Sequence, residues 1–133
     1  MRPFVMVIDH SMTVRKILEV TFERAGWPVC TFADGLQALR ALEQEEVPVP
    51  EALVIDVGLP KLNGYAVARA FRRQPACRQC IILFLSGQDG VFDRLRRRLA
   101  GGHASIMKPF QPAEVVQILE TLLYSAQQDQ RFG

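Results

Sequence analysis

Four short apolar runs in this sequence are each followed at once by a polar residue of a kind that handles phosphate. These residues are two aspartates, a serine and a lysine: Asp9 after residues 4–8, Asp56 after 52–55, Ser86 after 81–85 and Lys108 after 104–107. Short apolar runs that alternate with helical patterns are typical of a parallel sheet buried on both faces. Ligands of such sheets bind at the carboxyl ends of the strands, where the strand order reverses. We therefore expect the four side chains to converge on one small site, which suits transfer of a phosphoryl group to a carboxylate.

The composition is that of one globular domain. The chain has 133 residues, of which 49% are hydrophobic and 23% charged, a balance typical of soluble proteins. A net charge of +2 and the lack of any recognition-helix module argue against nucleic acid as a partner. No apolar run approaches the roughly 20 residues that a membrane span requires. The sequence enters a strand pattern almost at once and shows no signal-peptide pattern, so we expect a cytoplasmic protein.

Hydrophobic periodicity divides the chain into five strand–helix units. We expect strands at about 4–8, 28–32, 52–55, 81–85 and 104–107, and helices at about 12–25, 36–42, 65–74, 91–99 and 112–126. Right-handed crossovers place such helices on both faces of one sheet. The helix at 91–99 is expected to bury Phe92, Leu95 and Leu99. Residues 1–126 would form the domain, and 127–133 a polar, frayed tail.

The three cysteines give a weaker signal. Cys77 and Cys80 form a Cys-x-x-Cys pair, whereas Cys30 stands apart. A thioredoxin-like motif lies between a strand and the start of a helix, but this pair follows a helical segment and precedes a strand. A zinc site would need two further ligands, and none is evident nearby. We interpret all three as ordinary thiols.

The order of these polar anchors along the chain matches a known family. The matching residues are Asp9, Asp56 with Leu59-Pro60 and Gly64 behind it, Ser86-Gly87, and Lys108-Pro109-Phe110. With them the chain resembles, over residues 4–124, the receiver domain of two-component response regulators of the stand-alone chemotaxis type. The resemblance implies a flavodoxin-like α/β fold, a single doubly wound sheet of five parallel strands in the order 2-1-3-4-5. The segment 85–93 also resembles regulators of type IV pilus twitching motility.

The resemblance assigns a role to each anchor. Asp56 is expected to accept a phosphoryl group from a phosphohistidine of a histidine kinase or phosphotransfer domain. Lys108 would pair with one phosphoryl oxygen and Ser86 would donate a hydrogen bond to another, since this transfer depends on positioning and charge neutralisation. Movement of the Ser86 hydroxyl toward the phosphate would repack the helix that follows. The bond between Lys108 and Pro109 is expected to be cis. Such a protein is a signalling switch and not an enzyme that turns over a substrate.

The sequence departs from the family pattern at His10. The family has two adjacent acids after the first strand, which hold magnesium together with the acceptor aspartate, and here the pair reads Asp9-His10. Magnesium prefers oxygen ligands, whereas imidazole suits transition metals better. The expected ligands are therefore Asp9, Asp56 and the backbone carbonyl of Gly58, and His10 is a poor candidate.

Three interpretations of the Asp9-His10 pair stay open. Magnesium could bind more weakly through the two aspartates, the Gly58 carbonyl and water. Protonated His10 could instead supply part of the missing positive charge. As the alternative to phosphorylation, the domain could be an atypical pseudo-receiver that acts as an interaction module without it. Retention of the acceptor, the serine and the lysine favours phosphorylation. A nucleotide or flavin site is disfavoured because no glycine-rich phosphate loop follows the first strand.

Output is expected through protein–protein contact. The family often has an aromatic switch residue three positions before the lysine, and Ser105 stands there, so other contacts must report the state of the site. Four arginines cluster within Arg94–Arg98, which we interpret as a solvated face, with an acidic partner docking on it as the alternative. His103 is interpreted as a surface residue at the start of a strand. The downstream partner is expected to be a motility or pilus protein, and the chain itself a monomer or weak dimer.

Overall fold

Five parallel strands form one sheet in the order β2-β1-β3-β4-β5, as the resemblance implied. The computed structural model describes the backbone of residues 2–87 and 91–132 and the side chains of residues 2–87 and 93–129. The strands are β1 (Val5–Ile8), β2 (Val29–Phe32), β3 (Ala52–Asp56), β4 (Ile81–Ser86) and β5 (Ala104–Met107). Every neighbouring pair is parallel. The strand order reverses between β1 and β3, which is where a ligand site is expected in this class of sheet.

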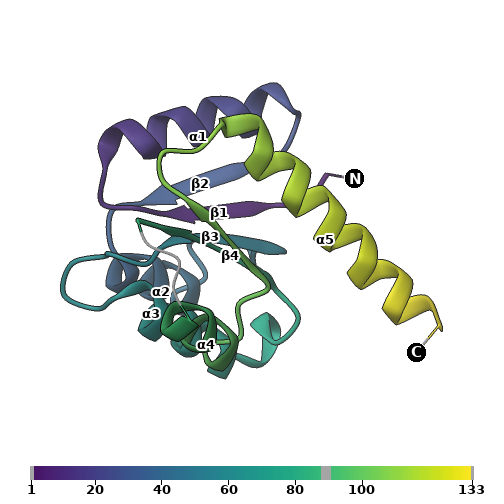
Figure 1. The fold of residues 1–133 in the computed structure, drawn as a ribbon. Coiled ribbons are helices and arrows are strands. Elements are labelled where there is room, and N and C mark those ends of the chain that lie inside the picture. The colour runs from purple at the N-terminus through teal and green to yellow at the C-terminus, as the bar shows by residue number, and fades with distance from the viewer. Residues whose placement is uncertain (1, 88–90, 133) are drawn as a thin grey trace.

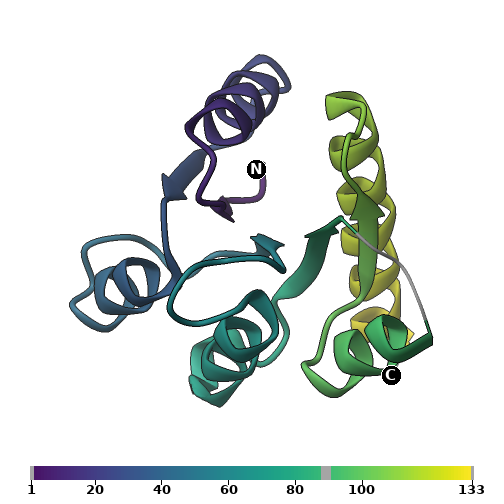
Figure 2. The ribbon, with the colours of Figure 1, turned by 60° about the vertical axis from the view of Figure 1, so that its left-hand side comes forward.

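Helices cover both faces of the sheet. They are α1 (Met12–Arg24), α2 (Gly35–Glu43), α3 (Gly64–Arg73), α4 (Val91–Leu99) and α5 (Pro112–Phe132), with a short 3₁₀ helix η1 (Pro75–Cys77) before β4. Figures 1 and 2 show α1 and α5 against one face, and α2, α3 and α4 against the other. Among the residues described, no helix has both the length and the apolar character needed to cross a membrane.

Side chains in the loops after β1, β2 and β3 cap the helices that follow. Ser11 Oγ accepts a hydrogen bond from the backbone N–H of Val14 at 3.2 Å, and Asp34 and Asn63 cap α2 and α3 in the same way. A side-chain oxygen at this position satisfies an N–H group that the helix itself leaves unpaired. The caps of α1 and α3 therefore fix both helices directly beside the carboxyl ends of β1 and β3.

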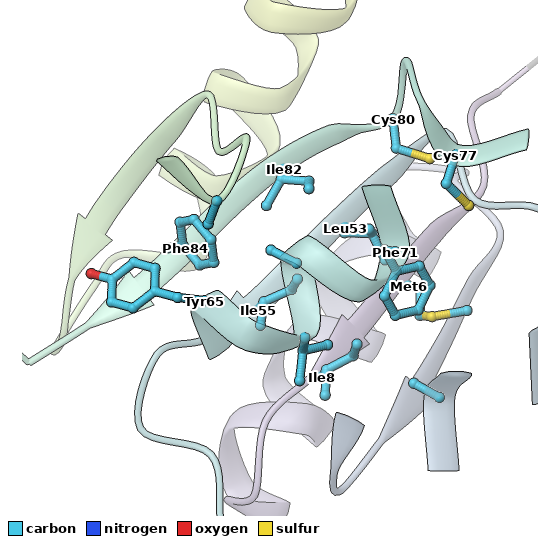
Figure 3. Close-up of a cluster of buried hydrophobic side chains, with 14 of the residues drawn as sticks. Met6, Ile8, Leu53, Ile55, Tyr65, Phe71, Cys77, Cys80, Ile82 and Phe84 are labelled. Carbon is cyan, nitrogen blue, oxygen red and sulfur yellow. The ribbon is translucent and has the colours of Figure 1, made fainter. Parts of the chain in front are cut away.

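The central strands are buried on both faces, so alternate residues enter two separate cores. Met6, Ile8, Leu53 and Ile55 pack against α2 and α3, as Figure 3 shows, whereas Val5 and Val7 face α1 and α5 on the other side. Each fully buried large apolar side chain contributes about 1.5–3 kcal/mol to folding. The two cores hold β1 and β3 as a rigid base for the residues at their carboxyl ends.

Two details of the helices differ from expectation. Leu95 is 51% and Leu99 70% exposed, so the prediction that both are buried was wrong; the side chain of Phe92 lies outside the described residues. The stem of Arg97 instead lies close to Gly102. In addition, α5 continues past residue 126 to Phe132, because no glycine or proline interrupts the chain before Gly133.

Candidate functional site

The four strand-end residues lie along one edge of the sheet. Asp9 follows β1, Asp56 ends β3, Ser86 ends β4 and Lys108 follows β5. The register pairs Asp56 with Leu85, so Ser86 lies one residue further along the neighbouring strand. The backbone N–H of Lys108 donates to the carbonyl oxygen of Ser86 at 2.8 Å. Parallel pairing thus brings together groups that stand up to 99 positions apart in the sequence.

Lys108 links the two aspartates. Its Nζ donates to Asp9 Oδ2 at 2.8 Å and lies 3.5 Å from Asp56 Oδ1. Asp9 is completely buried, and its Oδ1 also accepts the backbone N–H of Ser11 at 2.9 Å. A buried carboxylate is tolerated only with such charged and hydrogen-bonding partners. The ammonium group is consequently held where two negative charges meet.

The carboxylate of Asp56 is oriented from two sides. Its Oδ1 accepts the backbone N–H of Gly58 at 3.0 Å, which closes a short turn after β3. Its Oδ2 lies 2.9 Å from Nδ1 of His10. Because an ionised carboxylate can only accept, Nδ1 of His10 donates in this hydrogen bond. Asp56 is 5% exposed, so little of its surface is open to solvent.

His10 lies at the mouth of the site. Its side chain is 57% exposed, and Nδ1 is 3.9 Å from Asp9 Oδ1 in addition to its contact with Asp56. The sequence identified His10 as the departure from the family pattern but did not predict that the ring would contact the acceptor carboxylate. An exposed ring can turn away into solvent, so access to Asp56 requires the loss of one hydrogen bond.

Two of the three candidate ligand residues in the site suit a hard divalent cation. Asp9, His10 and Asp56 offer ligand atoms that all lie within 4.8 Å of one another, the only group of three found within the described part of the chain. Two carboxylates are typical magnesium ligands, and each oxygen can accept more than one partner. The imidazole is a poor ligand for such an ion and uses the Oδ2 atom of Asp56. The Gly58 carbonyl stays a predicted ligand.

Small residues make room around the acceptor. A Cβ atom added at Gly64 would lie 2.3 Å from the backbone oxygen of Asp56, so only glycine lets α3 start against the end of β3. A Cβ added at Gly87 would meet nothing within 4 Å. The space beside Gly87 is therefore open, whereas the neighbouring Ser86 is buried. The peptide bond between Lys108 and Pro109 is cis, as predicted.

One contact between α4 and β5 was not predicted from the sequence. Nη1 of Arg97 on α4 donates to Oγ of Ser105 on β5 at 2.5 Å. On the same helix the carbonyl oxygen of Asp93 accepts a long hydrogen bond from the Tyr65 hydroxyl at 3.4 Å, and the Tyr65 ring makes an edge contact with Phe84 (Figure 3). An arginine therefore reaches the position where the family often has an aromatic residue.

The side chain of His103, directly before β5, makes a hydrogen bond to the neighbouring strand β4. Its Nδ1 accepts the backbone N–H of Ile82 at 3.1 Å, and its own backbone N–H donates to the Ile82 carbonyl at 2.8 Å. The residue as a whole is exposed, yet partial burial of the ring lowers the pKa of His103, and the nearby charge of Arg72 lowers it further. The neutral ring thus extends the hydrogen bonding between β4 and β5.

An apolar groove opens beside the site. It has a volume of about 490 Å³ and is lined by Val14, Ile17, Lys108, Pro109, Phe110 and Pro112. Met12, at the start of α1, is 75% exposed, and Ile17 is 41% exposed. A protein that brings a reactive group to Asp56 would therefore find apolar surface next to the mouth of the site.

Comparison with known proteins points to one family. A family model described as the response regulator receiver domain matches residues 5–120. Protein PilG of Pseudomonas aeruginosa is 31% identical over 112 residues, which cover 84% of this chain and 81% of PilG. The alkaline phosphatase synthesis transcriptional regulatory protein PhoP of Bacillus subtilis is 34% identical over 119 residues, which cover 90% of this chain and 48% of PhoP. The chain thus spans about half the length of PhoP.

Solved structures agree on the fold. Chemotaxis protein CheY4 of Vibrio cholerae superposes with a TM-score of 0.85 at 24% identity and covers 92% of this chain and 99% of its own. A response regulator described as putative, from Chloroflexus aurantiacus, gives a TM-score of 0.83 at 29% identity, over 93% of this chain and 99% of its own. The doubly wound fold that the resemblance implied is thereby confirmed.

Proposed function

Because this chain belongs to the family of response regulator receiver domains, we propose that it accepts a phosphoryl group on Asp56 and signals through contacts with other proteins. The observation that carries the proposal is the position of Lys108 Nζ, 2.8 Å from Asp9 and 3.5 Å from Asp56. If Lys108 only formed a structural ion pair, one aspartate would be enough to neutralise its charge. The Lys108 ammonium lies between two aspartates at the carboxyl edge of the sheet. This position suits the binding of a phosphoryl group, which brings further negative charge.

The reaction is transfer of a phosphoryl group from a phosphohistidine to a carboxylate. An Asp56 oxygen forms the new bond to phosphorus while the phosphorus–nitrogen bond breaks, and the donor imidazole leaves and takes up a proton. The protein contributes mainly position and charge to such a transfer. Lys108 neutralises one phosphoryl oxygen, and the Ser86 hydroxyl donates to another. The hydrogen bond from Gly58 to Oδ1 of Asp56 keeps the acceptor in place.

Magnesium fits this site through Asp9 and Asp56, with the Gly58 carbonyl and water as further ligands. The ion supplies positive charge that offsets the charge of the transferred group. His10 replaces the second acid of the family pattern, so the site holds one negative charge fewer and the ion binds more weakly. To bind the ion or the phosphoryl group through Oδ2, Asp56 must give up its hydrogen bond with His10.

The proposal makes the chain a switch without turnover, since the phosphoryl group stays on its own aspartate. The histidine kinase or phosphotransfer domain that donates it would dock over the apolar groove between α1 and Phe110, which borders Lys108. The place of action is then the compartment of that kinase domain, for which we propose the cytoplasm. The chain would act as a monomer or weak dimer.

The output surface is formed by α4 and β5. Leu95, Leu99 and Met107 are exposed there, at 51%, 70% and 51%, among the arginines of residues 94–98. Apolar side chains among positive charges suit an acidic protein partner. The match to Protein PilG and the resemblance of residues 85–93 to twitching-motility regulators favour a motility or pilus protein in this role.

Acetyl phosphate tests the proposal with a small donor. The purified chain is incubated with acetyl phosphate and MgCl₂, and its intact mass is measured. We expect an increase by one phosphoryl group in the wild type, none in Asp56→Asn, and a slower increase in Lys108→Ala. Unchanged mass of the wild type with magnesium, manganese or zinc would contradict the proposal and favour an interaction module that acts without phosphorylation.

A further inference from the structure

Two cysteines lie together at the amino end of β4. Cys77 ends η1, and Cys80 directly precedes Ile81, the first residue of β4. Their exposed fractions are 0% and 4%, and Figure 3 shows both side chains at one end of the core that faces α2 and α3. Asp56 lies at the opposite end of the neighbouring strand. The phosphoryl chemistry therefore makes no use of these thiols.

The turn that joins the cysteines brings their sulfur atoms within reach of each other. The backbone N–H of Cys80 donates to the carbonyl of Cys77 at 3.3 Å. A turn of this kind keeps its end Cα atoms within about 7 Å, and disulfides join Cα atoms about 4.4–6.8 Å apart. The Cys80 thiol has two acceptors in reach, the Pro50 carbonyl oxygen at 2.9 Å and the Cys77 sulfur. The turn is therefore compatible with a disulfide between the two cysteines.

Arg72 places a positive charge beside the pair. Its guanidinium donates to the carbonyl oxygens of Cys77, Arg78 and Gly101 at 3.0, 2.9 and 2.7 Å, so it is firmly held. The hydrogen bond from Cys80 lowers the pKa of the Cys77 thiol, an effect that outweighs burial and that Arg72 reinforces. The same hydrogen bond and burial raise the pKa of Cys80. Cys77 is therefore the thiol that ionises, and Cys80 the one that keeps its proton.

A cavity leads from solvent to Cys80. Its volume is about 290 Å³, and Val49, Pro50, Ala76, Gln79, Cys80 and Leu123 are among the residues that line it. This space admits a molecule of the size of hydrogen peroxide as far as Cys80. Cys77 is buried and does not line the cavity, so the peroxide must pass the Cys80 side chain to reach the Cys77 sulfur. A metal ion is a poor alternative occupant, because the one three-ligand group among the described residues is at the opposite end of the sheet.

We propose that Cys77 and Cys80 are an oxidation site that reacts with a small hydroperoxide to form a disulfide within the chain. The Cys77 thiolate attacks one peroxide oxygen, the O–O bond breaks, and Cys77 becomes a sulfenic acid while the other oxygen leaves as hydroxide. The Cys80 sulfur then attacks the Cys77 sulfur and a second hydroxide leaves. The hydroxides take the two thiol protons, so two thiols and one hydrogen peroxide give one disulfide and two waters. The sulfurs are oxidised and the peroxide oxygens are reduced.

Cys30 provides an internal control. It lies on β2 and is free, and burial raises the pKa of Cys30 to about 11, whereas the pKa of Cys77 lies below the ordinary value of 9.0. This difference makes the thiolate fraction of Cys77 larger than that of Cys30. We expect Cys77 to react faster than Cys30.

The test follows oxidation of the reduced full-length chain by hydrogen peroxide. Samples taken over time are denatured, alkylated with iodoacetamide and digested with trypsin. Cleavage after Arg78 places Cys77 and Cys80 in different peptides, residues 74–78 and 79–94. The proposal expects these two peptides to become disulfide-linked faster than Cys30 loses its free thiol. Oxidation of Cys30 at the same rate or faster, or loss of both thiols without a linked peptide, would overturn it.

Two variants separate the roles of the sulfurs. Cys80→Ser should leave a sulfenic acid on Cys77 that dimedone traps, whereas Cys77→Ser should leave Cys80 unreactive. Equal dimedone labelling of both variants would contradict the order of steps. If either variant fails to fold, the wild type in urea replaces it. There the difference in rate between Cys77 and Cys30 should disappear, and its persistence would show that the fold does not create it.

Discussion

Nδ1 of His10 lies 2.9 Å from Oδ2 of Asp56, so the residue that departs from the family pattern contacts the acceptor of that pattern. A second acid at this position would add a ligand oxygen for magnesium. The histidine instead gives the acceptor a hydrogen-bond donor and reduces the negative charge of the site. Asp9 and Asp56 keep the family identity, so we expect any difference from the family in metal binding to arise at position 10.

Restoring the acid at position 10 should strengthen magnesium binding. We expect His10→Asp to bind Mg²⁺ on the order of tenfold more tightly, the change that a gain of about 1.4 kcal/mol produces. His10→Asn is the matched control, since it removes the imidazole without adding charge. Isothermal titration of MgCl₂ measures both. Equal affinity of the aspartate and asparagine variants would show that charge at this position does not limit binding.

Gly64 should be required for stability, and Gly87 should not. A Cβ at Gly64 would lie 2.3 Å from the backbone oxygen of Asp56, whereas one at Gly87 meets nothing within 4 Å. We expect Gly64→Ala to lower the free energy of unfolding by about 1–3 kcal/mol and Gly87→Ala to change it by less than about 0.5 kcal/mol. Urea unfolding measures the two. A similar loss in both variants would mean that α3 can shift away from β3.

The contact between Arg97 and Ser105 should couple α4 to β5. Hydrogen bonds to charged groups contribute about 1.5–3 kcal/mol when buried and less when half-exposed, so we expect an interaction energy of about 1 kcal/mol. Urea unfolding of Arg97→Met, Ser105→Ala and the double variant forms a thermodynamic cycle. Arg96→Met is the control, paired with the same serine. Strict additivity of Arg97→Met and Ser105→Ala would exclude the coupling.

His103 should make the chain less stable below neutral pH. Its folded pKa is lowered, so the unfolded chain binds the proton more strongly. Its contribution is therefore complete above the unfolded pKa of about 6.5 and is lost as pH falls toward the folded pKa. His103→Asn keeps an acceptor for Ile82 but does not titrate. Between pH 7.5 and 5.5 the free energy of unfolding should fall more in the wild type than in this variant. An equal fall in both would contradict this assignment, because all other titrating groups are shared.

Much of the fold could be predicted because β1, β3 and β4 are uninterrupted apolar runs. Such runs are compatible with burial on both faces, and parallel pairing then brings Asp9, Asp56, Ser86 and Lys108 to one edge. The strand pattern of the sequence thus predicts that these residues share one edge of the sheet, but it does not predict the directions of their side chains.

The directions of individual side chains could not be predicted from the sequence. Periodicity indicated an apolar face on α4 but not which way that face turns, and Leu95 and Leu99 point outward while Arg97 reaches Ser105. An arginine has an apolar stem that can pack inward while its charged end finds a partner, which a binary pattern of polar and apolar residues does not show. The contact of His10 with Asp56 was hidden for the same reason.

The beryllofluoride complex tests the central claim most directly, because this compound mimics a phosphoryl group on an aspartate. A crystal structure with BeF₃⁻ and MgCl₂ should show beryllium on an oxygen of Asp56, with fluorine atoms in contact with Lys108 Nζ and Ser86 Oγ, and His10 turned away from Oδ2 of Asp56. Crystals grown under the same conditions with Asp56 unmodified and still bonded to His10 would contradict the claim that this edge of the sheet is a phosphoryl-accepting site.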